Sequence, residues 1–187
     1  MTKEEIFSLK TEKVIGKNIN LRIATENDAE FILKLRLNPL LNKYINLTDP
    51  NVENQRIWIR NSFEKINDFH FIIESKQGIP FGTVAIYDID YETGVALWGR
   101  WVIKPDSFVF FSVESTILIL YYAFKKLGLN KLTGGANNKN IPVLNFHKLY
   151  ASISSVDETH TWFVFEESNF IKILNIFKKF HNIQFST

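Results

Sequence analysis

The central part of the chain joins a long strand pattern to a long apolar helix pattern. Residues 95–106 read VALWGRWVIKPD, and residues 108–126 read FVFFSVESTILILYYAFKK. Aromatic and β-branched side chains from Val95 to Ile103 predict a strand, and the proline that follows ends it. The second run is shorter than a membrane span and carries polar residues, so it predicts a buried helix that ends before Gly128. A strand that leads directly into a helix N-terminus presents unpaired amides, which suit a phosphate group.

The remaining patterns extend this unit into one domain of α/β (α+β) class with a mixed central sheet. The predicted strands are 19–23, 69–74, 81–86, 95–103, 129–136, 153–156 and 161–165, and the predicted helices begin near residues 25, 51, 108, 140 and 168. Their order, βααβββαβαββα, is an antiparallel meander followed by a βαβ-type crossover. No linker or internal repeat interrupts it, so we expect one domain over 1–187, with an N-terminal arm at 1–17 and a C-terminal helix and tail at 168–187.

Composition excludes several classes of protein. The chain of 187 residues has 22 Lys+Arg against 20 Asp+Glu, a formal net charge of +2, and 14% aromatic residues. Balanced charge gives no general attraction to nucleic acid or to an anionic membrane, and the aromatic residues supply a core. The sequence has no cysteine, which excludes thiol nucleophiles, disulfides and thiolate metal sites and agrees with a cytoplasmic protein. We expect no metal, no nucleic acid and no membrane among its ligands and partners.

Polar residues that follow the strand at 129–136 indicate a ligand site. Asn137, Asn138 and Asn140 carry amide groups that can bond amide-like parts of a small molecule, and the titratable His147 follows one short helix later. Loop asparagines also form turns, and a lone histidine on a helix also packs in a core. These residue types alone therefore leave both interpretations open.

Two segments combine these residues in a specific order. Residues 140–151 read NIPVLNFHKLYA, and residues 98–106 read WGRWVIKPD. The segment 140–151 is similar to the N-x-x-A-[IV]-x-[LF]-[YH] helix of the GNAT superfamily of acyl-coenzyme A N-acyltransferases. The segment 98–106 resembles that family's fourth strand and the P-[DE] that follows it, and the resemblance of the whole chain covers about residues 19–165. It implies that the fourth and fifth predicted strands run parallel and splay into a V, which admits the pantetheine arm of acetyl-coenzyme A.

The same resemblance implies which residues contact acetyl-coenzyme A. They are Trp101, Val102, Ile103, Phe108, Val109, Phe110, Phe111, Ser112, Val113, Asn137, Asn140 and Phe146. The main chain of residues 101–103 would bind the pantetheine arm in place of a missing strand. Segment 107–113 departs from the family's R-G-x-G-x-[AG] loop because it has no glycine, and Ala151-Ser152 replaces the usual Gly-Phe. The helix amides remain available, so we expect phosphate binding of a different shape there.

The resemblance also implies direct attack of a primary amine on the thioester, without a covalent enzyme intermediate. His147 takes the Tyr/His position of the family and is the expected proton donor to the departing thiolate. Asp90 and Glu92, with Asp88 in the same turn, are the expected bases acting through water, although carboxylates in turns also bond nearby amides. A main-chain amide near Val102 is expected to stabilise the oxyanion.

The acceptor is expected to be a nucleotide-linked amino sugar. Residues 35–39, LRLNP, together with residues 57–59, IWI, resemble members that acetylate amino sugars on nucleotide carriers or protein N-termini. The residues expected to bind the acceptor are Arg36, Asn38, Tyr87, Trp98 and Arg100. Their aromatic rings offer a platform for a sugar or a base, and Arg100 can pair with a phosphate, a carboxylate or a protein acid.

Two alternatives to this function stay open. One is a protein N-terminal acetyltransferase. The other is a non-catalytic module of the same fold that binds coenzyme A or another protein, and the glycine-free segment 107–113 favours it. The oligomeric state, a homodimer included, also stays open.

Overall fold

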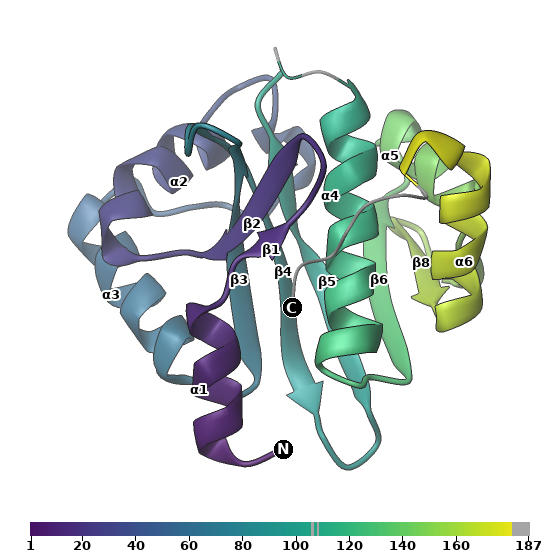
Figure 1. The fold of residues 1–187 in the computed structure, drawn as a ribbon. Helices are drawn as coiled ribbons and strands as arrows, with labels where there is room; N and C mark the ends of the chain where they lie inside the picture. The colour runs from purple at the N-terminus through teal and green to yellow at the C-terminus, as the bar shows by residue number, and fades with distance from the viewer. Residues whose placement is uncertain (106, 108, 181–187) are drawn as a thin grey trace.

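One mixed sheet of eight strands runs through the computed structural model, which describes residues 1–105, 107 and 109–180 (Figure 1). The strands are β1 (Val14–Ile15), β2 (Ile19–Ile23), β3 (Asp68–Ser75), β4 (Pro80–Asp90), β5 (Val95–Ile103), β6 (Lys131–Asn137), β7 (Ser152–Val156) and β8 (His160–Phe165). They lie in the order β1-β2-β3-β4-β5-β6-β8-β7. Neighbouring strands are antiparallel except for β5 and β6, which run parallel. This is the predicted mixed sheet with the short β1 added at one edge.

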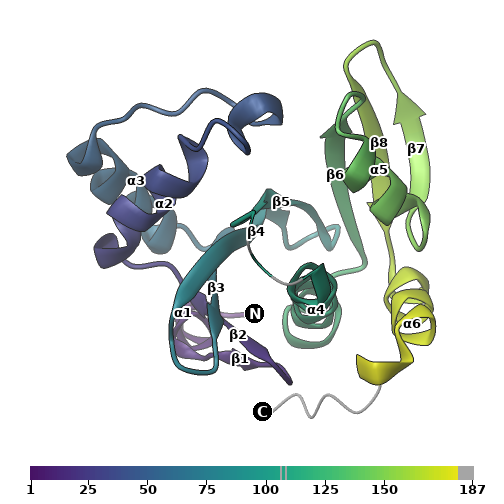
Figure 2. The ribbon, with the colours of Figure 1, turned by 90° about the horizontal axis from the view of Figure 1, so that it is seen from above.

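Helices cover both faces of the sheet. They are α1 (Lys3–Thr11), α2 (Ala29–Arg36), α3 (Val52–Glu64), α4 (Val109–Tyr121), α5 (Ile141–Lys148) and α6 (Glu167–Ile176). Figure 2 shows α2 and α3 together on one side of the sheet, and α4 on the other. The segment predicted as an arm contains α1 and β1, because a capping box at Thr2 and Glu5 starts a short helix there.

Strand β3 shows how the sheet separates two hydrophobic clusters. Phe69 and Phe71 point to one face and contact the ring of Tyr122, which follows α4, at centroid distances of 5.7 and 5.0 Å. Ile72 points to the other face and packs in a smaller cluster with residues of α2 and α3. Successive side chains of a strand alternate between faces, so His70 lies on the same face as α2 and α3.

The N-terminal helix is fastened to the end of α3 by one buried lysine. Lys10 is 3% exposed, and its Nζ donates hydrogen bonds to the carbonyl oxygens of Ser62, Phe63 and Lys65. The last carbonyls of a helix lack partners within the helix, and a cation there is favourable. Lys10 therefore satisfies the C-terminal end of α3.

The parallel strands β5 and β6 diverge soon after they begin. They pair at Val95–Lys131, Ala96–Leu132 and Leu97–Thr133, and no pair follows. The fourth and fifth strands of the predicted order therefore splay into a V, as the family resemblance implied. Beyond Leu97, the main chain of β5 on this side has no strand partner.

A bulge in β5 lies just past the point of divergence. Gly99 pairs with Ala85 of β4, and the next pair is Val102 with Thr83. Between these two pairs, β5 has two residues where β4 has one. Arg100 adopts a positive φ of 50°, which is unusual for a residue other than glycine. The Thr83 hydroxyl donates a 2.7 Å hydrogen bond to the carbonyl of Arg100 and holds this conformation.

Strand β4 is longer than the sequence predicted. It continues past residue 86 to Asp90, because Ile89 is buried and Asp90 pairs with Val95 across an irregular register. Asp88, predicted to begin a turn, lies within this segment at a φ of 51°.

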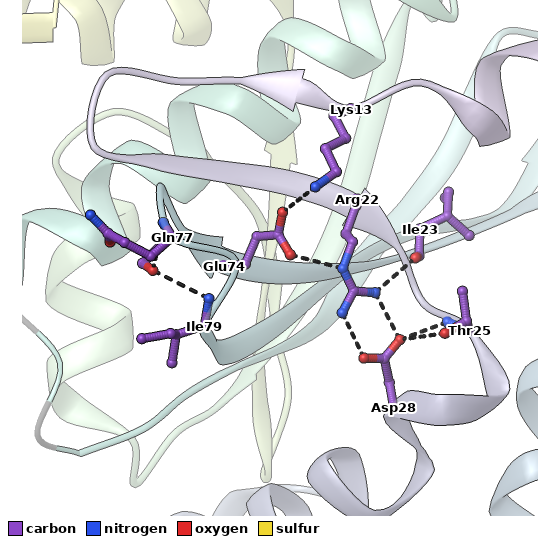
Figure 3. Close-up of polar contacts among 9 residues, drawn as sticks. Lys13, Arg22, Ile23, Thr25, Asp28, Glu74, Gln77 and Ile79 are labelled. Atoms are coloured by element: carbon purple, nitrogen blue, oxygen red, sulfur yellow. Dashed lines mark hydrogen bonds and ion pairs between the residues drawn. The ribbon is translucent and has the colours of Figure 1, made fainter.

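A buried ion network ties β2 and β3 to the start of α2 (Figure 3). Arg22 Nε donates to Glu74 at 2.8 Å, and the Arg22 Nη atoms donate to both carboxylate oxygens of Asp28 at 2.8 and 2.7 Å. Lys13 pairs with the other oxygen of Glu74 at 2.7 Å. Glu74 is 2% exposed, so its charge depends on these two cations.

Replacing Glu74 with Gln should lower the free energy of unfolding by about 2 kcal/mol or more, because Arg22 loses one of its two acidic partners in a buried setting. Urea denaturation monitored by tryptophan fluorescence measures the change. Glu53→Gln is the matched control, since Glu53 is exposed and pairs with Arg56 at 3.5 Å, and about 0.5 kcal/mol or less is expected there. Equal effects of the two substitutions would contradict the role assigned to the network.

Candidate active site

A cavity of about 900 Å³ opens where β5 and β6 diverge. Its walls come from β5 and β6, from α5, from β8, and from α2, α3 and the loop at residues 44–49. This volume lies in the range of sites that enclose a small-molecule ligand. The cavity therefore joins the segment that carries Asn140 and His147 to the segment that carries Arg36.

Aromatic rings from β5 and α5 form the wall around His147. The His147 ring lies 4.9 Å from the ring of Trp98 and 5.8 Å from that of Trp101, measured between centroids. In a regular strand, residues 98 and 101 would face opposite sides. The bulge at Arg100 turns both indoles towards His147, so the sequence-predicted Trp98, Trp101 and His147 come together.

His147 is neutral in this environment. Its side chain is buried among aromatic rings, and this burial lowers its pKa to about 3. Nδ1 lies 2.9 Å from the Tyr150 hydroxyl. Burial raises the pKa of Tyr150 well above its usual value, against a hydrogen bond with Thr116, so the phenol keeps its proton. A neutral imidazole has one N–H donor and one acceptor nitrogen, so Nδ1 either accepts from this hydroxyl or donates to it. The low pKa means that His147 does not carry at neutral pH the extra proton expected of a general acid.

The residues predicted to line a phosphate loop form the first turn of α4. Phe110 and Phe111 are partly buried and pack against the core, with the Phe111 ring 4.7 Å from that of Phe81, and Val113 is buried. Val109, at the helix start, is exposed. The side chains of Phe110 and Phe111 thus turn into the core, so a phosphate at this end of α4 would meet the main chain of the first turn. Phe108 lies outside the described residues.

Three further predicted contacts of acetyl-coenzyme A lie on β5 beyond its last pair with β6. Trp101 lines the cavity and stacks on Phe146 at 5.7 Å, and its Nε1 donates to Ser115. Val102 is buried, and Ile103 pairs with Gly82 of β4. On the side that faces β6, the main-chain N–H and C=O groups of these residues have no strand partner. These groups can therefore hydrogen-bond a ligand.

The predicted asparagines lie at the turn between β6 and α5, and Ser112 lies in the first turn of α4. Asn137 lines the cavity, and its Oδ1 accepts a hydrogen bond from the amide of Lys139. Asn140 occupies the N-cap position of α5 without a side-chain capping bond, and it also lines the cavity. The Ser112 carbonyl accepts hydroxyl hydrogen bonds from within α4. Asn140 and the Nδ2 group of Asn137 can therefore both offer an amide N–H to a ligand in the cavity.

Arginines and aromatic rings form the opposite wall. The Arg100 guanidinium lies 4.2 Å from the Tyr87 ring and 4.9 Å from the Trp58 ring, and it pairs with Asp68 at 2.7 Å. Arg36 Nε donates to the Thr48 hydroxyl at 2.8 Å, and its Nη2 donates to the Asn46 carbonyl at 3.2 Å. Arg36, Tyr87 and Arg100 all line the cavity, as predicted for acceptor contacts.

Asn38, also predicted to bind the acceptor, does not line the cavity. Its Oδ1 accepts a hydrogen bond from the amide of Leu40, two residues later. This is the turn-forming behaviour typical of asparagine before proline. The structure therefore does not bring Asn38 into the predicted acceptor site.

The predicted bases lie away from the cavity. Asp88, Asp90 and Glu92 are at or near the hairpin where β5 begins, whereas the cavity opens further along β5. The Asp90 carboxylate accepts hydrogen bonds from the Thr93 hydroxyl and from the amides of Thr93 and Glu92, and these bonds lower its pKa. Asp90 is thus a turn-stabilising residue, and the structure does not bring it or Glu92 to His147.

Several cavity residues were not predicted from the sequence. His70 and Trp58 lie near Arg100, while His160 and Trp162 of β8 line the rim. Trp162 Nε1 donates to Asp157 at 2.8 Å, and its ring lies over Gly135, where a Cβ would come within 2.8 Å of the indole. The sequence signals were the segment at residues 57–59, which contains Trp58, and His70 itself, a polar residue in a largely apolar strand pattern.

The described residues contain no group of three or more His, Cys, Asp or Glu side chains placed to hold a metal ion. None of the helices in the described part of the chain is long and apolar enough to cross a membrane.

Comparison with known proteins gives a match to a family model and similarities to solved structures. The family model of the acetyltransferase (GNAT) domain matches residues 18–149. The fold is similar to the solved structure of apo FdhC, a nucleotide-linked sugar GNAT, with a TM-score of 0.81 and 29% identity over 91% of this chain and 98% of that chain. It is also similar to spermidine N-acetyltransferase from Vibrio cholerae in complex with CoA and spermine, with a TM-score of 0.73 and 17% identity over 82% and 98% of the two chains. No curated protein sequence matches the chain.

The two buried histidines predict how stability depends on pH. Burial lowers the pKa of His70, as it does that of His147, to about 3, whereas an unfolded histidine titrates near 6.5. Between these values the unfolded state binds more protons, so stability rises with pH and is lost as pH falls below about 6.5. Each histidine should lower the free energy of unfolding by about 2 kcal/mol between pH 7 and pH 5.

Urea denaturation at the two pH values tests this expectation. His147→Gln should reduce the loss of stability between pH 7 and pH 5 by about 2 kcal/mol, because it removes one of the two titrations. Asn145→Ala, on the exposed side of the same helix, should leave the loss unchanged. If His147→Gln shows the wild-type pH dependence, His147 is not held neutral.

Proposed function

Because the chain belongs to the acetyltransferase (GNAT) family, it is an acetyl-coenzyme A-dependent N-acetyltransferase, and we propose that its acceptor is a primary amine on a nucleotide-linked sugar. The observation that carries the proposal is the charge of the acceptor wall. Arg36 and Arg100 line the cavity, and Asp49 is the one carboxylate among its described lining residues. A polyamine would meet two guanidinium groups there, whereas a sugar that carries phosphates would be attracted.

The size and the aromatic lining of the cavity support the same acceptor. About 900 Å³ accommodates a sugar together with a nucleotide. Trp58, Tyr87 and Trp162 present rings to this space, and flat rings suit the apolar faces of sugars and bases. A protein N-terminus with a basic tail would meet a single carboxylate, that of Asp49, among the described lining residues.

The donor would lie along the opposite side of the cavity and extend beyond it to the start of α4. The main chain of β5 past Leu97 would bind the pantetheine arm, the first-turn amides of α4 would bind the pyrophosphate, and Asn140 would bond the arm through its free amide. Acetyl-coenzyme A, when bound, supplies the activated acetyl group. A main-chain amide of β5 near Val102 would stabilise negative charge on the acetyl oxygen.

His147 would act as a neutral hydrogen-bond donor to the leaving sulfur. As the amine nitrogen forms a bond to the acetyl carbon, the carbon–sulfur bond breaks and its electron pair remains on the sulfur. The Nε2 proton of His147 would stabilise that charge, and Tyr150 would keep this proton on Nε2 by donating to Nδ1. Water in the open cavity would take the amine proton, because the predicted carboxylates lie elsewhere.

His147→Ala should lower turnover by about 10²-fold, because the transition state loses its donor at the sulfur. The affinity for acetyl-coenzyme A should stay close to the wild-type value, as measured by calorimetry. Asn145→Ala, on the same helix, should retain wild-type turnover. Wild-type turnover in His147→Ala would remove His147 from the reaction.

An acceptor panel tests the proposed substrate class. Nucleotide-linked amino sugars, the matching free amino sugars, spermidine and N-terminal peptides are compared by release of coenzyme A. The nucleotide-linked sugars should give a kcat/KM about 10²-fold or more above that of the free sugars, because the phosphates add charge-assisted contacts. Preference for spermidine or peptides would overturn the acceptor assignment, and the absence of transfer to every amine would favour the non-catalytic alternative.

A further inference from the structure

Three nitrogen-bearing side chains from three separate elements meet around Trp58 at the acceptor end of the cavity. The Arg100 guanidinium from β5 lies 4.9 Å from the Trp58 ring, and the His70 ring from β3 lies edge-on to the same indole at 5.3 Å. Arg36 from α2 lines the cavity beside them. The charges are close enough to interact: burial and then Arg100 and Arg36 lower the pKa of His70, and burial and then Arg100 lower that of Arg36.

The protein itself does not balance this cluster. His70 is 6% exposed, its Nδ1 is fully buried without a hydrogen-bond partner, and no described residue bonds its other ring nitrogen. Arg36 is hydrogen-bonded only to the neutral groups of Thr48 and Asn46 within the described part of the chain. An unsatisfied buried nitrogen and two neighbouring cations both cost stability. This loss of stability is expected at a binding site, where a bound ligand supplies the missing hydrogen-bond partner and the missing negative charge.

We propose that Arg36, His70 and Arg100 form a subsite for the phosphates of the acceptor, an inference that rests on the proposed function. A phosphate offers acceptor oxygens in several directions, and these three side chains approach from three elements with N–H donors. Arg100 uses one Nη to bond Asp68, so its other N–H groups face a ligand. His70 donates through a ring N–H, and the anion compensates the repulsion between the two arginines.

Coenzyme A also carries phosphates, so the two phosphate sites must be told apart. The first turn of α4, where the donor's pyrophosphate is placed, does not line this cavity among the described residues. The acceptor subsite lies instead on the face of the sheet covered by α2 and α3. Saturating coenzyme A should therefore leave this subsite open to a second anion.

The test measures binding of inorganic pyrophosphate and of uridine diphosphate by calorimetry, with the full chain saturated by coenzyme A. Both probes should bind, and Arg36→Gln and His70→Leu should each weaken them by about tenfold or more, as for loss of a charge-assisted contact. Arg60→Gln is the matched control, because it removes the same charge from an exposed position on α3, and it should change affinity less than about twofold. Acetate, tested in the same way, should bind more weakly than pyrophosphate.

His70→Leu has an additional readout that a purely structural role would not produce. It removes the unsatisfied ring nitrogen, so the melting temperature of the free protein should stay the same or rise while anion affinity falls. A lower melting temperature with unchanged anion affinity would overturn the proposal. Equal affinity for acetate and pyrophosphate would overturn the assignment to phosphate, and competition between coenzyme A and pyrophosphate would reassign the anion to the donor site.

Failure of this subsite is distinguishable from failure of the proposed function. If nucleotide-linked amino sugars are acetylated while Arg36→Gln and His70→Leu keep the wild-type KM and anion affinity, the subsite is wrong and the function stands. If the variants lose pyrophosphate binding but such sugars are not acetylated, the subsite stands and the acceptor assignment fails.

Discussion

The structure depends on the bulge at Arg100, which lies just after β5 and β6 stop pairing. The bulge turns Trp98 and Trp101 to the same side of β5, where both contact His147. It also sends Arg100 to the other side, between Tyr87 and Trp58. One irregular residue thus fixes the aromatic wall proposed for the donor and the cationic wall proposed for the acceptor, and the cavity between them follows from the missing strand pairs.

The two walls differ in their electrostatics, and this difference separates their tasks. Around His147 the side chains are apolar rings, burial keeps the imidazole neutral, and its Nδ1 lies 2.9 Å from the Tyr150 hydroxyl. Around Trp58 the arginines are only partly neutralised by Asp68. A neutral region suits an uncharged thioester, and a cationic region suits an anion. Both regions contain strained or unsatisfied groups, so bound ligands should stabilise the fold by mass action.

Local sequence patterns predicted the order of strands and helices along the chain and the helix that follows Asn140, because each rests on contiguous residues, and the family resemblance implied the divergence of the two parallel strands. The predicted bases failed for a reason that no local pattern reveals. Asp90 and Glu92 are close to β5 in sequence, but they precede it, and the direction of the strand carries the cavity away from them. His70 was missed because its position depends on the pairing of β3 with β4 and on Trp58 from a distant helix. Segment 109–113 lacked glycine, yet its phenylalanines turn into the core, which depends on packing that the sequence does not display.

Lys10, which hydrogen-bonds the last carbonyls of α3, affects where the chain can be truncated without loss of stability. The family model begins at residue 18, so a gene trimmed to that boundary would still encode the sheet from β2 onwards. It would lose Lys10, and the last carbonyls of α3 would lose the ammonium group that fastens them. Because α3 carries Trp58, against which His70 and Arg100 are placed, the first helix braces, from outside the cavity, the helix that positions these side chains.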